Sequence, residues 1–363
     1  MMVTSKFVKN ASVERLLKLW AARYVPDLST LSSQASKCAV SELVRAASPD
    51  GRVQTVAKLS QIVEIHCKCA GIQTSVLFSY IPNIVNLTES QGIAKVAGEV
   101  YQKVLEVYQE QLSPSTFLAA VQQVGTVDVS VEALKSFVMP ALEPSVVEQL
   151  ATAIEPILQE FQEQHLSSSD RRTIGFMSTQ FHLSSTLVLN RLSLPEQLLL
   201  SPYFKFIEEQ VCIPWQRICT AACQYPTDSQ VLTLVEQLLP ASLEIAISVY
   251  NQAIQLYPHY RSRRGRLSEP GVKASSIRDI EMFQAYLALS VLEQNMTVVE
   301  QELHPLCVMV YPSVDVSWEL VEQMIKLLVN EIFARVKPEH KSLLLPYTSA
   351  MQQLFSQAKT MAV

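Results

Sequence analysis

The chain has 363 residues, of which 48% are hydrophobic and 17% are charged, and its formal net charge is -5. A chain of this length usually folds as more than one domain. Because the net charge is negative and no basic stripe follows a helix, nucleic acid is not expected as a partner. Only 8 glycines are present, and the absence of a glycine-rich phosphate motif argues against a nucleotide-binding α/β fold.

The compartment follows from three features of the sequence. No run of 18 or more apolar residues occurs, so no transmembrane segment is expected. The first ten residues lack the apolar stretch of a signal peptide. The 7 cysteines have irregular spacing, which favours free thiols in a reducing compartment. We therefore expect a cytoplasmic protein.

Helical periodicity dominates the first half of the chain, and strand-like alternation is confined to short stretches such as 127–131. Thr88 and Gln91 have capping-box spacing and predict a helix start there. Helices are expected over 12–24, 31–47, 53–70, 89–111, 114–124, 130–139 and 145–164. The polar stretch Ser167–Arg172 predicts a linker between a helical domain of unknown type, 1–166, and a second domain, 175–363.

The second half is also read as helical, so the fold class is all-α. Helices are expected over 195–223, 228–257, 276–293, 297–310, 316–336 and 339–358. The stretch Tyr257–Ser275 between two of these helices is expected to be a long loop without regular structure, and such loops are often functional.

Four clustered arginines lie in this loop, namely Arg261, Arg263, Arg264 and Arg266. Guanidinium groups match carboxylates in a bidentate way, so the cluster predicts a mobile surface that binds an acidic protein partner. Two alternatives remain open, a solvated loop without a role and a clamp for the carboxylates of a small ligand.

Metal binding and catalysis find little support in the residue patterns. His66, Cys67 and Cys69 are close in sequence, but zinc requires a fourth ligand, and no metal is expected. The spacing of Cys212, Cys219 and Cys223 is typical of a buried helix face. The isolated histidines lack partners at useful spacing and predict no haem ligand; they are His182, His259, His304 and His340. Catalytic motifs are absent, so the chain is not expected to be an enzyme.

The second half resembles the phycobilisome proteins, the globin-like light-harvesting subunits of cyanobacteria. The resemblance runs from Leu200 to Ser356 and rests on the order and spacing of several segments, not on one motif. They are "LLLSPYFKFIEEQV", "ASLEIAISVYNQAIQLYPHY", "IEMFQAYLALSVLEQN", "VVEQELHPLCVMVYPSVDV", "LVEQMIKLLVNEIF" and "LLLPYTSAMQQLFS". It implies a globin-like domain after a helical bundle that the resemblance does not reach. Gln294 and Asp315 stand where the family has glycines at two turns.

The family attaches an open-chain tetrapyrrole, a bilin, to the cysteine of a C-L-R-D motif. Ser276 replaces that cysteine here, whereas Arg278 and Asp279 match the motif. In the family, the arginine pairs with a propionate and the aspartate accepts hydrogen bonds from pyrrole N–H groups. The resemblance thus implies no covalent bilin, with Arg278 and Asp279 as candidate ligands of one bound non-covalently. A plainer alternative is that Ser276 and Asp279 cap the start of a helix.

From this resemblance we expect a non-catalytic interaction or regulatory protein of cyanobacterial light harvesting, located in the cytoplasm or at the thylakoid surface. It would act on phycobilisome subunits, their assembly or their pigment supply. The alternative function is a sensor or carrier that binds a tetrapyrrole without a covalent bond. The sequence leaves the oligomeric state and the role of the N-terminal half open.

Overall fold

The computed structural model describes residues 10–26, 37–79, 85–111, 128–130, 141–165 and 172–357. Within these ranges the protein is almost entirely helical, which confirms the predicted all-α class. The expected helices 114–124 and most of 130–139 lie outside the described residues, as does most of the expected linker, 167–171.

The chain divides into two compact units, which differ from the predicted division near residues 166–175. One unit, the middle unit, comprises Ala21–Val211. The other, the terminal unit, combines Met1–Trp20 with Cys212–Val363. The helices after the expected linker therefore pack with the first half of the chain, and the N-terminal helix packs with the second half. Such long-range pairings leave no local signal in the sequence.

The middle unit is built around α4, α5 and α9, which pack against one another, and α5 also packs on α3 and α8. A short antiparallel pair joins Lys37–Ala39 (β1) to Asp128–Ser130 (β2). The helices of this unit are α2 (Val40–Ala47), α3 (Pro49–Ser60), α4 (Val63–Leu77), α5 (Leu87–Glu110), α8 (Pro144–His165), α9 (Arg172–Leu189) and α10 (Leu194–Cys212).

The start of α5 shows how a local sequence sets a helix boundary. The Asn86 side chain accepts a hydrogen bond from the Glu89 N–H, and the Glu89 carboxylate accepts one from the Asn86 N–H. This capping box satisfies N–H groups that have no partner within the helix. The predicted start at Thr88 was therefore two residues late, because Asn86 is the cap.

Aromatic rings fill the core of the middle unit. Tyr101 is fully buried, stacks on Phe181 at 6.0 Å and meets Phe204 edge-on at 4.8 Å. Its hydroxyl donates to the Phe181 carbonyl at 2.8 Å and lies 2.7 Å from the Ser185 hydroxyl. Buried polar groups are retained only where they find such partners, so this tyrosine fixes α5 against α9.

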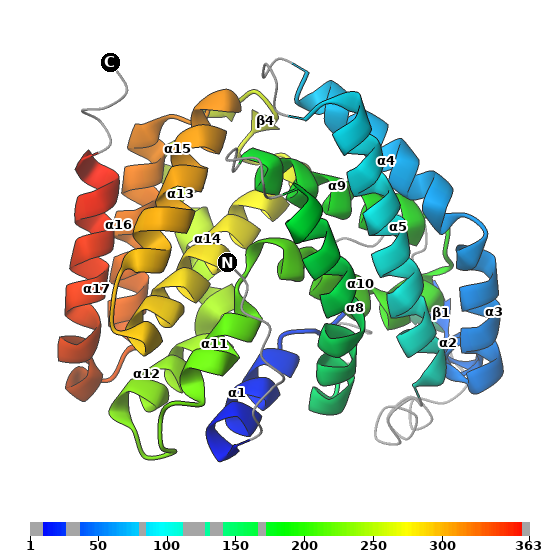
Figure 1. Cartoon of the computed structure of the whole chain (residues 1–363), viewed down its shortest axis with the longest axis horizontal. Helices are drawn as coiled ribbons and strands as arrows, with labels where there is room; N and C mark the ends of the chain where they lie inside the picture. Colours follow the sequence, from blue (N-terminus) through cyan, green and yellow to red (C-terminus); the bar gives the residue numbers. More distant parts are fainter. Residues whose placement is uncertain are drawn as a thin grey trace. The chain divides into compact units, whose positions relative to one another are not determined.

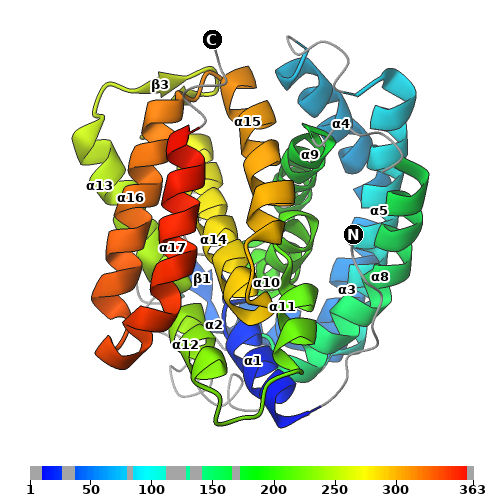
Figure 2. The same ribbon diagram turned by 60° about the vertical axis from the view of Figure 1, so that its left-hand side comes forward.

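The terminal unit contains α14 as its central helix, with α11, α12, α13 and α17 packed on it and α16 between α13 and α17 (Figure 1). Figure 2 shows α16 and α17 side by side. Its elements are α1 (Ala11–Ala21), α11 (Trp215–Ala222), α12 (Gln230–Leu238), the 3-10 turn η1 (Leu239–Ala241), α13 (Ser242–Leu256), β3 (Arg261–Ser262), β4 (Gly265–Arg266), α14 (Pro270–Glu293), the π-helical turn η2 (Val299–Leu303), α15 (His304–Ser313), α16 (Trp318–Arg335) and α17 (Pro338–Gln357).

Helix α1 is held to the terminal unit by specific polar bonds. The Asn10 side chain donates to the Cys223 carbonyl at 2.9 Å, and the Ser12 hydroxyl donates to the Tyr225 carbonyl at 2.8 Å. Trp20 stacks on Trp215 with 5.8 Å between ring centroids. The first helix of the chain is therefore part of a core formed mainly by its last 150 or so residues.

By length and composition alone, one helical stretch among the described residues could cross a membrane, Gln230–Leu256. In the structure it consists of α12, η1 and α13, and α13 packs on α14 and α16. This is weak evidence for a membrane span, and the predicted lack of a transmembrane segment stays a prediction.

Candidate functional site

The residues that correspond to the expected ligand motif lie inside α14. This helix begins at Pro270, with Glu269 as its N-cap, and runs to Glu293. Ser276 and Asp279 therefore lie well inside the helix, where their N–H groups already have intrahelical partners. The alternative in which Ser276 and Asp279 cap a helix start is wrong. Proline at the first helical position was the signal for the true start.

Asp279 is engaged on both of its carboxylate oxygens. Its Oδ1 accepts hydrogen bonds from Arg278 Nη2 at 2.9 Å and Nε at 3.2 Å. Its Oδ2 lies 3.5 Å from the hydroxyl of Tyr311 on α15. The side chains of Arg278 and Asp279 are about a quarter exposed, at 23% and 25%. The two predicted ligands are thus brought together, and they already bind each other.

Cys307 lies one turn before Tyr311 on α15, and both side chains face the same polar region. Burial, followed by the Asp279 carboxylate, raises the pKa of the Cys307 thiol well above its usual value. Burial, with Cys307 and Asp279 close by, likewise raises the pKa of the Tyr311 hydroxyl. Both groups therefore stay protonated at neutral pH, so Tyr311 is a hydrogen-bond donor to Asp279 and Cys307 is a poor nucleophile.

A second ion cluster lies near the start of α11 and the end of α14. Arg217 Nη1 donates to both carboxylate oxygens of Glu302 at 2.9 Å, and Arg217 Nη2 lies 3.5 Å from Glu293. Burial raises the pKa of the nearby Tyr286 hydroxyl. An arginine with two acidic partners joins these elements, which is a structural role.

The stretch expected to be an unstructured loop is folded. Residues 261–262 and 265–266 form an antiparallel hairpin, and α14 begins a few residues later. Arg263 forms an ion pair with Asp315, with Nε and Oδ2 3.0 Å apart. Gly265 has φ of 131°, a conformation that side chains other than glycine rarely adopt. The expected lack of regular structure is wrong because two-residue strands are too short to show alternation, whereas mobility of the arginines stays a prediction.

One family model, described as phycobilisome protein, matches residues 217–355. The C-terminal part of the chain therefore resembles the phycobilisome protein family, as predicted. No curated protein and no solved structure matches the chain. The matched part contains the arginine hairpin, Asp279 and Tyr311, and it lies within the terminal unit.

Two backbone conformations in the phycobilisome-like region fit the resemblance. Gln294 and Asp315, which stand where the family has glycines, have φ of 54° and 57°. They are the only non-glycine residues with positive φ in the part of the chain that the structure describes. Left-handed backbone costs about 1–2 kcal/mol for a residue with a side chain. Both turns therefore have the backbone conformation that glycine favours, at the two positions where the resemblance places glycines.

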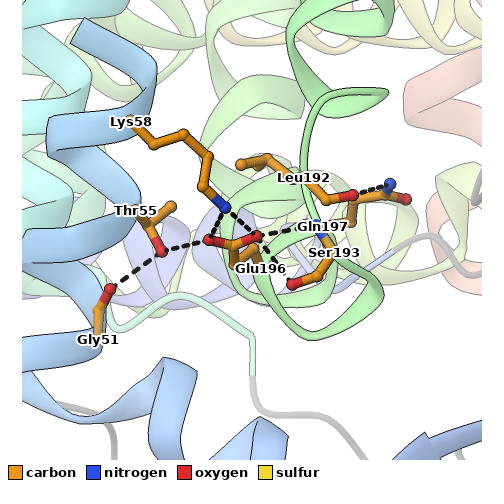
Figure 3. A network of polar contacts seen from close by, with 7 residues as sticks. All are labelled: Gly51, Thr55, Lys58, Leu192, Ser193, Glu196 and Gln197. Atoms are coloured by element: carbon orange, nitrogen blue, oxygen red, sulfur yellow. Dashed lines mark hydrogen bonds and ion pairs between the residues drawn. The ribbon is translucent and has the colours of Figure 1, made fainter.

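The middle unit, outside the phycobilisome-like region, contains a polar network that the sequence reading missed (Figure 3). Glu196 Oε2 accepts bonds of 2.8 Å from both the N–H and the hydroxyl of Ser193, and Lys58 Nζ binds both carboxylate oxygens at 2.7 and 2.9 Å. The Thr55 hydroxyl lies 3.2 Å from Oε1 and 3.0 Å from the Gly51 carbonyl, so it can donate its proton to either. Burial alone would raise the pKa of Glu196, but the bonds from Lys58 and Ser193 outweigh it and lower the pKa.

This network joins α3 to the start of α10, as Figure 3 shows. All acceptor positions of the Glu196 carboxylate point at groups of the protein itself, so it has no free lone pair facing an open site. The arrangement is typical of a structural anchor, not of a catalytic acid. Ser193 and Glu196 have the spacing of a capping box, a signal that the sequence did carry.

The cysteines and histidines do not converge on a metal site. Among the described residues no group of three or more potential ligands lies together. Cys67 is buried, and burial raises its pKa to about 12, whereas Cys69 is exposed. His66 Nε2 accepts from Arg191 Nε at 3.1 Å. The three residues face different ways, so they form no common site, and the expectation of no bound metal stays a prediction.

Cys212, Cys219 and Cys223 differ in burial, and only Cys219 is fully buried. His182, for which the sequence predicts no partner, has one in the structure: its Nδ1 lies 3.0 Å from the carboxylate of Glu208 on a different helix.

Proposed function

We propose that the protein is a non-catalytic interaction or regulatory protein of cyanobacterial light harvesting. It acts on phycobilisome subunits, on their assembly or on their pigment supply, in the cytoplasm or at the thylakoid surface. The match of residues 217–355 to the phycobilisome family supports the connection with light harvesting. The residues of the expected pigment site support the view that this region works without its own pigment.

The state of Asp279 is the single observation on which this proposal rests. A bilin held by this carboxylate would require it to accept bonds from pyrrole N–H groups. Its Oδ1 instead accepts two bonds from Arg278, and its Oδ2 faces the protonated hydroxyl of Tyr311. A bilin would have to displace these contacts, each of which contributes about 0.5–1.5 kcal/mol or somewhat more where a charged group is involved. Ser276 adds that no thioether can form at this position.

The second candidate is a sensor or carrier that binds a tetrapyrrole non-covalently. One observation favours it, namely that Arg278 and Asp279 are both retained and both partly exposed. An anionic propionate could compete with Asp279 for the Arg278 guanidinium, since arginine binds any carboxylate in the same way. Binding would then require Arg278 to exchange one carboxylate for another.

Two measurements separate these candidates. Denaturation of the native protein in acid urea, followed by zinc-enhanced fluorescence on a gel, should show no band, because no bilin is attached. Titration of the purified protein with biliverdin should leave the absorbance spectrum of the pigment unchanged. In parallel, the protein should sediment with purified phycobilisomes. A biliverdin spectrum that shifts with saturation, and that ceases to shift in Asp279→Asn, would instead establish the carrier. Failure to sediment with phycobilisomes or their subunits would overturn the interaction proposal.

A further inference from the structure

Two of the four clustered arginines lie directly opposite each other on the hairpin. Arg261 on β3 is the cross-strand neighbour of Arg266 on β4. Both residues are exposed, whereas Ser262 and Gly265, which form the next pair, are buried. Residues that oppose each other in an antiparallel pair point to the same face. The two guanidinium groups therefore share the outer face of the hairpin.

Antiparallel strands contain hydrogen-bonded and non-hydrogen-bonded residue pairs, and the side chains are closer in the second kind. The backbone bonds show that Arg261 and Arg266 form a non-hydrogen-bonded pair. Leu267 N donates to the Tyr260 carbonyl, and the N–H of Arg266 donates to the Glu269 carboxylate instead of to Arg261. The main-chain groups of Arg266 thus point away from Arg261, as in a pair without mutual hydrogen bonds. In such pairs the Cβ atoms are about 4.5–5.5 Å apart, and like charges oppose each other unfavourably.

The hairpin is held firmly from its inner side. The Tyr250 hydroxyl donates to the Leu267 carbonyl at 2.8 Å, and Leu267 packs with Val272 and Leu320 in a buried cluster. At the turn, Arg263 N donates to the Val314 carbonyl at 3.0 Å. The backbone under the two outer arginines is therefore ordered before anything binds, which lowers the entropic cost of binding.

Neither outer arginine forms an ion pair with any residue that the structure describes. Asp315 pairs with Arg263, and the Glu269 carboxylate, which accepts the N–H of Arg266, places one negative charge beside the two positive ones. The two exposed arginines outnumber this single carboxylate, so the outer face of the hairpin keeps a net positive charge that favours an anion.

We propose that Arg261 and Arg266 form the docking site for a carboxylate-rich segment of a partner protein. The pair presents two guanidinium forks, and each fork matches one carboxylate in a bidentate way. A protein segment is favoured over nucleic acid because the cationic face is only one residue pair wide and the whole chain has a net charge of -5. Nucleic-acid surfaces need an extended series of cations to follow the phosphates.

This inference rests on the proposed function only for the identity of the partner, a phycobilisome subunit. Lys273, which follows the hairpin in α14, is placed over the Tyr250 ring at 5.8 Å. Its ammonium group adds positive charge next to the hairpin, in the first turn of α14. An acidic segment that reaches Arg261 and Arg266 would therefore be expected to continue towards Lys273.

The test uses the full chain and two probes, a fluorescent octaglutamate peptide and purified phycobilisomes. The test variant is Arg261→Gln/Arg266→Gln. The matched control is Arg45→Gln/Lys341→Gln, which removes the same charge at exposed positions elsewhere. Peptide binding by the wild type should weaken as salt rises. The test variant should bind at least about ten-fold more weakly, since two charge-assisted contacts are lost, and the control should bind like the wild type. Tryptophan fluorescence and circular dichroism check that both variants fold.

The outcomes separate this inference from the proposed function. Arginine-dependent binding of octaglutamate without binding of phycobilisomes would keep the docking site and overturn the proposed function. Equal sedimentation of wild type and test variant with phycobilisomes would keep the function and overturn the docking site. The inference also fails if octaglutamate does not bind, or if a DNA oligonucleotide binds more tightly than the peptide through the same two arginines.

Discussion

Replacing Glu196 by glutamine should destabilise the middle unit while leaving the terminal unit unchanged. The substitution keeps the shape of the side chain but removes the negative charge that binds Lys58 and Ser193. It also places an amide N–H2 donor where a carboxylate oxygen now accepts from Lys58 or Thr55. The contact between α3 and the start of α10 should therefore weaken.

The expected cost follows from the parts of the network. The Lys58 side chain is 48% exposed, so its ion pair with Glu196 is worth about 0.2–1 kcal/mol. The bonds to Ser193 at the start of α10 resemble a capping box, which contributes about 1 kcal/mol. Glu196→Gln should thus cost about 1–2 kcal/mol, and Lys58→Met less than half of that. In a unit of this size, the midpoint temperature falls by about 2–4 °C for each kcal/mol.

The distribution of tryptophans makes the assay selective. The 3 tryptophans, Trp20, Trp215 and Trp318, all belong to the terminal unit. Tryptophan fluorescence therefore follows the terminal unit, whereas far-ultraviolet circular dichroism follows the helices of both. Glu196→Gln should lower the midpoint of the dichroism transition and leave the fluorescence transition in place. A double-mutant cycle with Lys58→Met gives the coupling energy of the pair.

The pH dependence of this difference has a definite sign. The folded state lowers the pKa of Glu196, so the stabilisation is present above the unfolded-state pKa of about 4.3 and is lost as the pH falls through the folded-state pKa. The difference between wild type and Glu196→Gln should be largest near neutral pH and should shrink below about pH 4. An effect that is absent at pH 7, or that equals the effect of Lys58→Met alone, would refute the assignment of the network as an anchor.

Three further outcomes follow from the same structure. Burial lowers the pKa of His304 in the folded protein. The terminal unit should therefore lose stability as the pH falls below about 6.5, where the histidine of the unfolded chain takes up a proton. Melting followed by tryptophan fluorescence should show this loss in the wild type but not in His304→Phe. Among the described cysteines, Cys69 should react first with a disulfide reagent at pH 8, because it is exposed. Cys67 and Cys219 are buried, and burial raises the pKa of each thiol to about 12. The Cys69→Ser variant should lack the fastest phase of the reaction. Gly265→Ala should destabilise the terminal unit by about 1–3 kcal/mol, because φ is 131° there and an added Cβ would clash with Glu269 Oε2. An unchanged melting temperature would contradict this expectation.

One long helix of the first half could be predicted from the sequence to within two residues at each end. The helix expected over 89–111 is α5, Leu87–Glu110. Its amphipathic pattern is local, so no knowledge of the rest of the fold was required. The start of α14 was missed by six residues, since Pro270 was read as part of a loop and not as the first residue of a helix.

The contacts that define the two units could not be predicted from local patterns. Lys58 and Glu196 are 138 positions apart, and Ser12 and Tyr225 are 213 positions apart. Each of these bonds joins elements that only the complete fold brings together. The capping half of the Glu196 network was readable from Ser193 and Glu196, whereas its ion pair with Lys58 was not.

The two candidate sites of the terminal unit lie on one continuous element. The hairpin leads directly into α14, and the buried contact of Leu267 with Val272 fixes the hairpin to the first turn of that helix. Asp279 lies further along the same helix and binds Arg278 and Tyr311. Under the proposed function, Asp279 has a structural role in this region and the hairpin arginines contact the partner. The Asp279 carboxylate accepts hydrogen bonds from Arg278 and Tyr311, while the two outer arginines form no ion pair with a described residue. Under the proposed function, the groups left to contact a partner are therefore the exposed arginines of the hairpin, and not the carboxylate of Asp279.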